Sequence, residues 1–318
     1  MKKAAFYTLG CKVNQYETEA MAELFADSGY EIKEFTEVAD VYVINTCSVT
    51  NMGDRKSRQI IRRAKKLNPN AVIAVTGCYA QTAPDEVLAI EGVNLVLGTK
   101  DRKNIVTLVE ELNTESNINH VSDIMSNHEF EELQIKQYSN RTRAFIKIQE
   151  GCNQFCSYCI IPYARGPVRS RAKDDVVREI KELAHNGFKE IILVGIHVAS
   201  YGVDLGDTTL ESLIMDVDKI DGVERIRLSS IEPMTLNQEF IDSIKDSKKL
   251  CHHFHISLQS GCDETLKRMN RKYTTAQFKG IVDGLREAFD DVAITTDIMV
   301  GFPDESDEEF NKLNEAAN

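Results

Sequence analysis

The stretch CNQFCSYC, Cys152–Cys159, places three cysteines at the spacing C-x3-C-x2-C. Three thiolates this close together can bind one face of a four-iron, four-sulfur cluster, which usually takes four cysteines. With only three, one iron keeps an open position, as a catalytic zinc ion does with three protein ligands. The motif therefore predicts a metal site that carries out chemistry and does not only carry electrons.

Other uses of these cysteines remain open from the residues alone. Zinc sites usually show two separated C-x2-C pairs, and this chain has no second pair. The N-terminal apolar run stops at Cys11, which favours a first strand over a signal peptide. Without a secretory signal, a disulfide framework is disfavoured in a chain of 318 residues. A zinc site and a chance group of buried cysteines stay as alternatives to a cluster.

Length and charge limit the classes of domain and partner. A chain of 318 residues predicts two domains. The net charge of −12 argues against broad, non-specific binding of nucleic acid, although it leaves room for a local basic patch. No apolar run is long enough to cross a membrane, so we expect no membrane partner. Free, well-separated cysteines favour a cytoplasmic protein.

The first 112 residues alternate short apolar runs with helical patterns, which predicts a doubly wound parallel sheet. Three of the runs are followed by a cysteine: Cys11, Cys47 and Cys78. Because the carboxyl ends of parallel strands share one edge of a sheet, we expect these thiols to face one point. They form a second candidate metal site, and three ordinary buried cysteines are the alternative. The predicted strands are 4–10, 40–46, 71–77 and 93–98, and the predicted helices are 17–28, 55–67 and 84–91.

The rest of the chain predicts a linker and a second domain. Residues 113–140 are polar and acidic without a clear period, which indicates a linker. Five strand–helix units in residues 141–318 predict a partial (β/α) barrel. CNQFCSYC follows the first of these strands, at the end of the barrel where active sites lie. The predicted strands are 144–149, 190–195, 225–230, 254–259 and 293–301; the helices are 174–186, 210–220, 237–246, 263–269 and 275–289, with one more opening near 305.

Several motifs together resemble those of the radical S-adenosylmethionine methylthiotransferases. The spacing C-x3-C-x-aromatic-C after the first barrel strand is similar to the radical S-adenosylmethionine motif. TLGCKVNQYETE, INTCSVTN, VTGCYAQ, LQSGCDETLKRMNRKYT and DIMVGFPDE are similar to the methylthiotransferases, so the resemblance covers nearly the whole chain. GIHVASYG and SRQIIRRAKKLNP look most like the branch that acts on threonylcarbamoyladenosine in tRNA.

The resemblance implies two four-iron, four-sulfur clusters and S-adenosylmethionine as cofactors. Cys152, Cys156 and Cys159 would hold the cluster that binds S-adenosylmethionine and cleaves it to a 5′-deoxyadenosyl radical. An auxiliary cluster would bring the sulfur, and no side chain is assigned a catalytic role because these groups carry the chemistry. The auxiliary cluster would be held by Cys11, Cys47 and Cys78, and the contacts to S-adenosylmethionine would come from Tyr158, Gly195, Glu232, Gln259 and Ser260.

The implied reaction replaces the hydrogen on carbon 2 of threonylcarbamoyladenosine, next to the anticodon, with a methylthio group. An unpaired base of this kind can be splayed into a pocket. The implied partners are tRNA, an electron donor such as flavodoxin, and a sulfur donor. Alternative targets are isopentenyl-adenosine in tRNA and a ribosomal protein side chain. A non-catalytic iron–sulfur or zinc module is the alternative from another class of function.

A basic stretch lies just after the second cysteine. Seven of the twelve residues in RKSRQIIRRAKK, 55–66, are Lys or Arg. Such a run is either a solvated helix face or a helix that contacts phosphates. If it contacts tRNA, the residues expected to do so are Arg55, Lys56, Arg58, Arg62 and Arg63.

The chain also departs from the family pattern. Asp304 stands where the motif GFPGE has its second glycine. The family continues through a sixth barrel unit and a small RNA-binding β-barrel domain. We therefore expect a barrel truncated after its fifth strand, with that last domain absent.

Overall fold

The computed structural model describes residues 1–48, 50–135 and 142–316. The chain divides into two compact units. The first consists of Met1–Ser139 and Ile160–Arg169, and the second of Asn140–Cys159 and Ser170–Asn318. In the described part of the chain, no helix combines the length and the apolar character that a membrane span requires.

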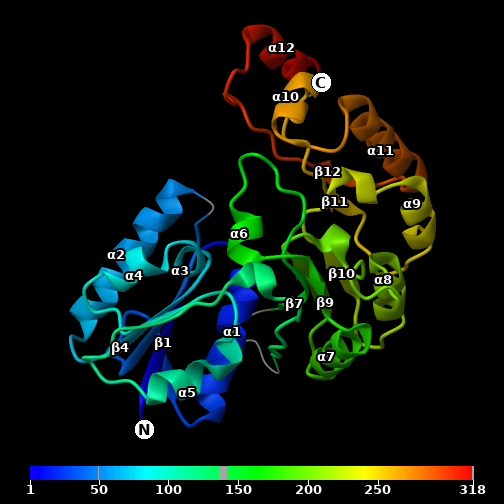
Figure 1. Ribbon diagram of the computed structural model, residues 1–318. Coiled ribbons are helices and arrows are strands. Elements are labelled where there is room, and N and C mark those ends of the chain that lie inside the picture. The colour runs from blue at the N-terminus through cyan, green and yellow to red at the C-terminus, as the bar shows by residue number, and fades with distance from the viewer. Residues whose placement is uncertain (49, 136–141, 317–318) are drawn as a thin grey trace. The chain divides into compact units, whose positions relative to one another are not determined.

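The first unit contains a six-stranded parallel sheet in the order β2-β1-β3-β4-β5-β6 (Figure 1). The predicted parallel sheet is therefore confirmed, and helices lie on both of its faces. The strands are β1 (Lys3–Thr8), β2 (Glu31–Lys33), β3 (Val41–Thr46), β4 (Val72–Gly77), β5 (Leu95–Leu97) and β6 (Ile118–His120). The helices are α1 (Lys12–Asp27), α2 (Asn51–Leu67), α3 (Cys78–Thr82), α4 (Pro84–Leu88), α5 (Ile105–Glu110) and α6 (Ile161–Arg165), with 3-10 turns η1 (Arg102–Asn104) and η2 (Ile124–Ser126).

Each face of this sheet carries its own apolar core. On one face Ile61 of α2 and Val87 of α4 pack with Ile44 of β3. On the other face Phe25 of α1 packs with Val43 of β3. Strand β3 is buried at all six positions, because it lies in the middle of the sheet between two helical layers.

The sequence pattern does not predict several short elements. β2 and β6 have three residues each, too few to show a period. α1 begins at Lys12, earlier than the predicted start at 17, and Cys11 is its N-cap residue. The described part of 113–140, expected as a linker, contributes β6 and η2 to the first unit.

The second unit is a curled sheet covered by helices on its outer side. Its strands form a four-stranded sheet in the order β10-β9-β7-β8 and a two-stranded sheet β11-β12, and isolated parallel bridges, Ile226 to Leu250 and Ile231 to Ile256, connect the two. The strands β7, β9, β10, β11 and β12 thus follow one another in chain order and run parallel. That order is typical of a (β/α) barrel, and the sheet forms about half of one. The strands are β7 (Arg143–Glu150), β8 (Arg169–Ser170), β9 (Glu190–Gly195), β10 (Arg225–Leu228), β11 (His253–His255) and β12 (Ala293–Thr295).

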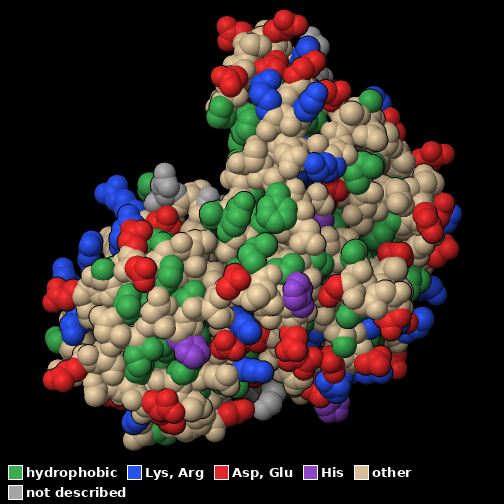
Figure 2. Space-filling model, in the orientation of Figure 1, with side chains coloured by type: hydrophobic (Ala, Val, Ile, Leu, Met, Phe, Trp, Pro, Cys, Tyr) green, Lys and Arg blue, Asp and Glu red, His purple; other side chains and the backbone are tan. Residues whose placement is uncertain are grey.

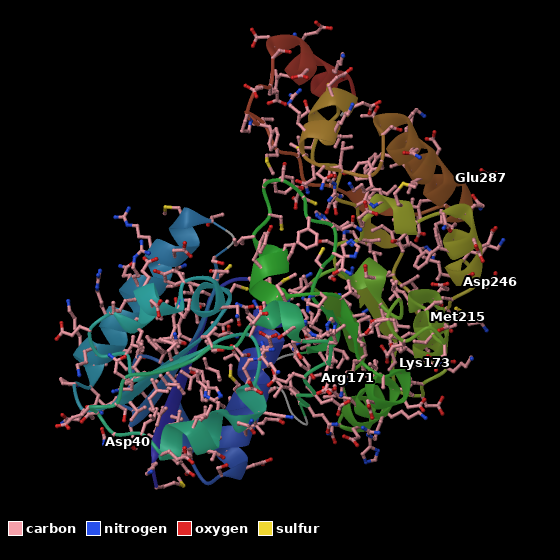
Figure 3. The ribbon with its side chains drawn as sticks, in the orientation of Figure 1. Asp40, Arg171, Lys173, Met215, Asp246 and Glu287 are labelled. Atoms are coloured by element: carbon pink, nitrogen blue, oxygen red, sulfur yellow. The ribbon has the colours of Figure 1, made fainter. Side chains whose placement is uncertain are left out.

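The helices of the second unit alternate with these strands. Figure 3 marks this outer layer with Met215 on α8, Asp246 just after α9 and Glu287 on α11. Lys173 at the start of α7 pairs with Asp216 of α8 at 2.9 Å, which ties adjacent helices together. The helices are α7 (Lys173–His185), α8 (Leu210–Asp218), α9 (Gln238–Ile244), α10 (Asp263–Arg268), α11 (Thr275–Ala288) and α12 (Asp307–Ala316), with 3-10 turns η3 (Val198–Ser200) and η4 (Pro233–Thr235).

Candidate metal centres

Three cysteines, called here the strand-end cysteines, follow adjacent parallel strands of the first unit. Cys11 caps α1 just after β1, Cys47 follows β3 directly, and Cys78 follows β4 as the first residue of α3. Because β1, β3 and β4 are neighbours in the sheet, their carboxyl ends lie side by side. Cys11 and Cys47 are close enough to Cys78 to raise the pKa of its thiol. The structure thus brings the three thiols to one edge, as the sequence predicts.

Two glycines allow this close approach. Gly77 has φ +97° and ψ −166°, a region that only glycine adopts readily. A Cβ atom on Gly77 would lie 2.4 Å from the carbonyl oxygen of Thr46. Gly10, with φ +102°, passes so near Cys47 that a Cβ atom there would lie 2.9 Å from the Cys47 Cβ.

Replacing Gly77 with Ala is expected to destabilise the first unit strongly. The left-handed backbone costs about 1–3 kcal/mol for a residue with a side chain, and overpacking against Thr46 adds roughly 1–3 kcal/mol. Gly29→Ala is the matched control, since Gly29 also has positive φ (+86°) but no atom within 4 Å of its new Cβ. Urea unfolding of both variants measures the difference. Equal free energies of unfolding would show that the close approach at Gly77 does not matter.

Polar side chains lie beneath the strand-end cysteines. Asn14 is buried and donates to the carbonyl oxygens of Leu9 at 2.7 Å and Thr46 at 3.0 Å, so it joins the ends of β1 and β3. The Nε of Arg165 donates to the Cys78 sulfur at 3.3 Å. Burial raises the pKa of the Cys78 thiol to about 11, an effect that Arg165 opposes. A bound metal ion would be needed to deprotonate this thiol at neutral pH.

The loop cysteines Cys152, Cys156 and Cys159 follow β7 in the second unit. The segment after α10 anchors their loop: the Ser157 amide donates to the Met269 carbonyl at 3.1 Å, and the Asn270 side chain donates to the Phe155 carbonyl at 2.8 Å. Phe155 has φ +49° within this tight loop. Hydrogen bonds therefore anchor the loop that carries the three thiols at the carboxyl end of the barrel strands.

A half-buried arginine also touches this second set. Nη1 of Arg271 donates to the Cys156 sulfur at 3.3 Å. Its guanidinium stacks 4.9 Å from the ring centre of Tyr273 and lies 3.7 Å from the Glu232 carboxylate. Burial raises the pKa of the Cys152 thiol to about 11. Each set of cysteines thus has one thiol that accepts a hydrogen bond from a guanidinium.

The residues expected to contact S-adenosylmethionine lie near the same ends of the strands. Tyr158 sits on the cysteine loop with 38% of its surface exposed, and Gly195 ends β9. Glu232 follows β10 and caps η4. Gln259, with φ +68°, follows β11. Ser260 is fully buried, and its hydroxyl accepts from the Cys262 amide at 3.2 Å; Glu232 is also buried, whereas Gly195 and Gln259 are half-buried.

Sequence reasoning missed Gln149 at the end of β7. This buried side chain donates to the carbonyls of Glu150 at 2.7 Å and Gly151 at 2.8 Å. Its oxygen accepts from the His197 amide at 2.7 Å, which joins the ends of β7 and β9. Burial, with help from Arg271, lowers the pKa of His197 to about 4, so this imidazole is neutral at pH 7. A polar residue near the carboxyl end of a buried barrel strand is the signal that could have identified Gln149.

No three thiols in the described part of the chain lie as close together as a single zinc ion requires. A tetrahedral zinc ion with Zn–S bonds of about 2.3 Å requires sulfurs about 3.8 Å apart. Among the described residues, only Cys262, Glu264 and Glu309 have three candidate ligand atoms within 4.8 Å of one another. In that group Glu309 is already paired with an arginine, since both of its carboxylate oxygens accept from Arg268, at 2.9 and 2.8 Å. Neither cysteine set therefore has the compact arrangement of a mononuclear site.

The basic stretch forms one face of α2, where Lys and Arg side chains gather (Figure 2). Arg55, Lys56, Arg62 and Arg63 are exposed. Arg58 differs from them because it donates to the Tyr79 hydroxyl at 2.9 Å and to Glu86 at 3.0 Å. A surface groove of about 500 Å³ runs along this face, lined by Arg55, Arg58, Gln59, Arg62, Arg63 and Lys66.

Two family models match the chain. The model described as "Radical SAM superfamily" matches residues 146–317, and the one described as "Uncharacterized protein family UPF0004" matches residues 3–98. These matches correspond to the barrel strands with the loop cysteines and to the sheet with the strand-end cysteines.

Curated relatives match nearly the whole chain. It is 50% identical over 312 residues to threonylcarbamoyladenosine tRNA methylthiotransferase MtaB of Bacillus subtilis, covering 98% of this chain and 69% of that protein. The protein of the same name from Aquifex aeolicus is 42% identical, with 98% and 76% covered. A tRNA-2-methylthio-N(6)-dimethylallyladenosine synthase of Thermoanaerobacter pseudethanolicus is 39% identical, with 95% and 66% covered.

Solved structures show the same fold at low identity. The radical S-adenosylmethionine methyltransferase TsrM from Kitasatospora setae aligns with a TM-score of 0.70 at 16% identity, covering all of this chain and 73% of that one. The cobalamin-dependent S-adenosylmethionine radical enzyme OxsB aligns with a TM-score of 0.65 at 10% identity, with 99% and 52% covered. At these identities the likeness concerns the fold alone.

Proposed function

The chain belongs to the methylthiotransferases of the radical S-adenosylmethionine superfamily, and we propose that it attaches a methylthio group to carbon 2 of threonylcarbamoyladenosine next to the anticodon of tRNA. The observation that carries this proposal is the presence of two separate three-cysteine sets, each at the carboxyl ends of parallel strands. Identity of 50% to a threonylcarbamoyladenosine-specific relative favours this nucleoside over the other targets.

The two cysteine sets take different cofactors in this proposal. The loop cysteines bind the cluster that holds S-adenosylmethionine, and the strand-end cysteines bind the auxiliary cluster. When bound, these groups supply the radical that removes hydrogen from carbon 2 and the methylthio group that replaces it. An external reductant such as flavodoxin and a sulfur donor complete the set of partners.

The protein's own residues position these groups. Asn14 holds the ends of β1 and β3 together, and Gln149 does the same for β7 and β9. The proposed contacts to S-adenosylmethionine at the barrel mouth come from Tyr158, Gly195 and Glu232. Gln259 contributes through its backbone turn, and Ser260 supports that turn from a buried position. Such pre-positioning lowers the entropic cost of bringing the reactants together.

We also propose that the exposed face of α2 contacts tRNA phosphates. Within the described part of the chain, Arg55, Lys56, Arg62 and Arg63 are exposed cations without a carboxylate partner, and they lie on one helix, where they can contact neighbouring phosphates. Arg58 belongs to the same basic run, but an ion pair with Glu86 offsets part of its charge. Its contribution to RNA binding is therefore the smallest of the five.

Changing Arg55, Arg62 and Arg63 to Ala together is expected to weaken tRNA binding and to lower the slope of log K against log salt by roughly 2, about 0.7 for each phosphate that is no longer neutralised. Filter binding over a salt series measures the slope. The matched control changes Arg178, Lys181 and Lys189, three exposed cations on and after α7, and should leave the slope unchanged. Equal slopes for the two triple variants would rule out α2 as the phosphate contact.

The substrate assignment is tested by mass spectrometry of nucleosides from cells that lack the gene. We expect 2-methylthio-threonylcarbamoyladenosine to disappear while unmodified threonylcarbamoyladenosine accumulates. Loss of the methylthio group from isopentenyl-adenosine, with the threonylcarbamoyl product intact, would assign the chain to the other tRNA branch.

A further inference from the structure

The Arg165 side chain contacts the strand-end cysteines, although it follows the loop cysteines in the sequence. It ends α6, and residues Ile160–Arg169 belong to the first unit. Two contacts fix α6 there: Thr99 donates from its hydroxyl to the Ala164 carbonyl at 2.7 Å, and Gly166 passes so close that a Cβ atom would lie 2.4 Å from the Ile124 carbonyl oxygen. These contacts therefore hold Arg165 at the strand-end cysteines.

Every nitrogen of the Arg165 guanidinium has a partner. Nη1 lies 2.5 Å from the Glu17 carboxylate, and Nη2 donates to Asn14 Oδ1 at 2.5 Å. These two contacts clamp the guanidinium plane and leave Nε pointing at the Cys78 sulfur, 3.3 Å away. Arg165 is 0% exposed and Cys78 is 3% exposed, so water does not compete for this bond.

The charge of Arg165 is balanced within the same buried group. Glu17 also pairs with Arg102 at 2.6 Å, and Arg102 pairs in turn with Glu131 at 2.8 Å. Two guanidinium groups therefore face two carboxylates. Arg165 acts on Cys78 both through its positive charge and through a directed hydrogen bond.

We propose that Arg165 is a positioning residue of the auxiliary cluster, which orients the Cys78 sulfur and stabilises the reduced cluster through its N–H···S bond. This inference rests on the proposed function, in that the strand-end cysteines hold a cluster. Hydrogen bonds to the sulfurs are one of the factors that set the potential of an iron–sulfur cluster. Partners that orient a metal ligand also raise the affinity for the metal.

The test uses a protein in which Cys152, Cys156 and Cys159 are Ala, so that only the auxiliary cluster is observed. In this background Arg165→Lys keeps a positive charge near Glu17 but loses the planar group that reaches three partners at once. We expect a lower midpoint potential in an EPR-monitored redox titration. We also expect iron to be lost to a chelator about tenfold faster or more. Arg165→Met, which has a side chain of similar length but no N–H donor, is measured in parallel in case the lysine variant does not fold.

Arg102→Lys is the matched control. It disturbs the same Glu17 carboxylate in an equally buried position, but the Nε of Arg102 donates to Glu131. It should reduce thermal stability, as Arg165→Lys does, without changing the midpoint potential.

The outcomes separate this inference from the function on which it rests. An unchanged potential and unchanged iron release in both Arg165 variants would overturn the role of Arg165 and leave the auxiliary cluster in place. Equal shifts in the Arg102 and Arg165 variants would also overturn it, since general loosening would then explain the effect. If the background protein binds no iron at all, the cluster assignment itself is wrong, and the role of Arg165 is overturned with it.

Discussion

Protein with Cys152, Cys156 and Cys159 changed to Ala is expected to hold about four irons after anaerobic reconstitution, half of the roughly eight expected for two clusters. It is also expected to form no 5′-deoxyadenosine from S-adenosylmethionine. The reason is that the proposed role of this loop is to hold the cluster that cleaves the cofactor. Iron and sulfide analysis, with chromatography of the cleavage product, measures both effects.

Cys251→Ala is the control for this experiment. Cys251 lies in the same unit, just before β11 and outside both cysteine sets. The variant should keep about eight irons and form 5′-deoxyadenosine at the rate of the unchanged protein. Retention of the full iron content in the triple variant would show that the loop cysteines do not hold a cluster.

The second large effect is expected from changing Cys11, Cys47 and Cys78 to Ala. This variant should also hold about four irons, but it should still cleave S-adenosylmethionine, because the loop cysteines are intact. It should form no methylthio product, since the proposed role of the auxiliary cluster is to bring the sulfur. The same reaction mixture provides both readouts: 5′-deoxyadenosine and the modified nucleoside are separated in one chromatographic run.

The pair of triple variants separates two steps of the proposed reaction. Loss of cleavage in one variant and loss of transfer alone in the other would assign one step to each cysteine set. Methylthio product formed by the strand-end variant would instead mean that the sulfur comes from elsewhere.

The fold can be predicted where the local apolar pattern is strong. β3 is buried along its whole length, and the run DVYVINT shows this in the sequence. The edge strand β6 cannot be recognised in this way, because its three residues are exposed and carry no apolar pattern. The common edge shared by Cys11, Cys47 and Cys78 follows from the topology of parallel sheets.

The residues that support the cysteines cannot be predicted in the same way. Arg165 is 87 residues from Cys78 in the sequence, and Arg271 is 115 residues from Cys156. Neither lies in a pattern that marks a metal site, because an arginine near a thiol follows from tertiary packing and not from spacing along the chain. Ser260 shows the converse limit: the sequence places it at the end of a strand, but its hydroxyl is buried against the Cys262 amide.

Addition of a methylthio group to carbon 2 of threonylcarbamoyladenosine can be measured directly with the purified protein. The anaerobically reconstituted protein is incubated with S-adenosylmethionine, a reductant, a sulfide source and tRNA from cells that lack the gene, and the nucleosides are followed by mass spectrometry. We expect 2-methylthio-threonylcarbamoyladenosine to appear as threonylcarbamoyladenosine declines. A methylthio group on isopentenyl-adenosine, with threonylcarbamoyladenosine unchanged, would contradict the proposed function.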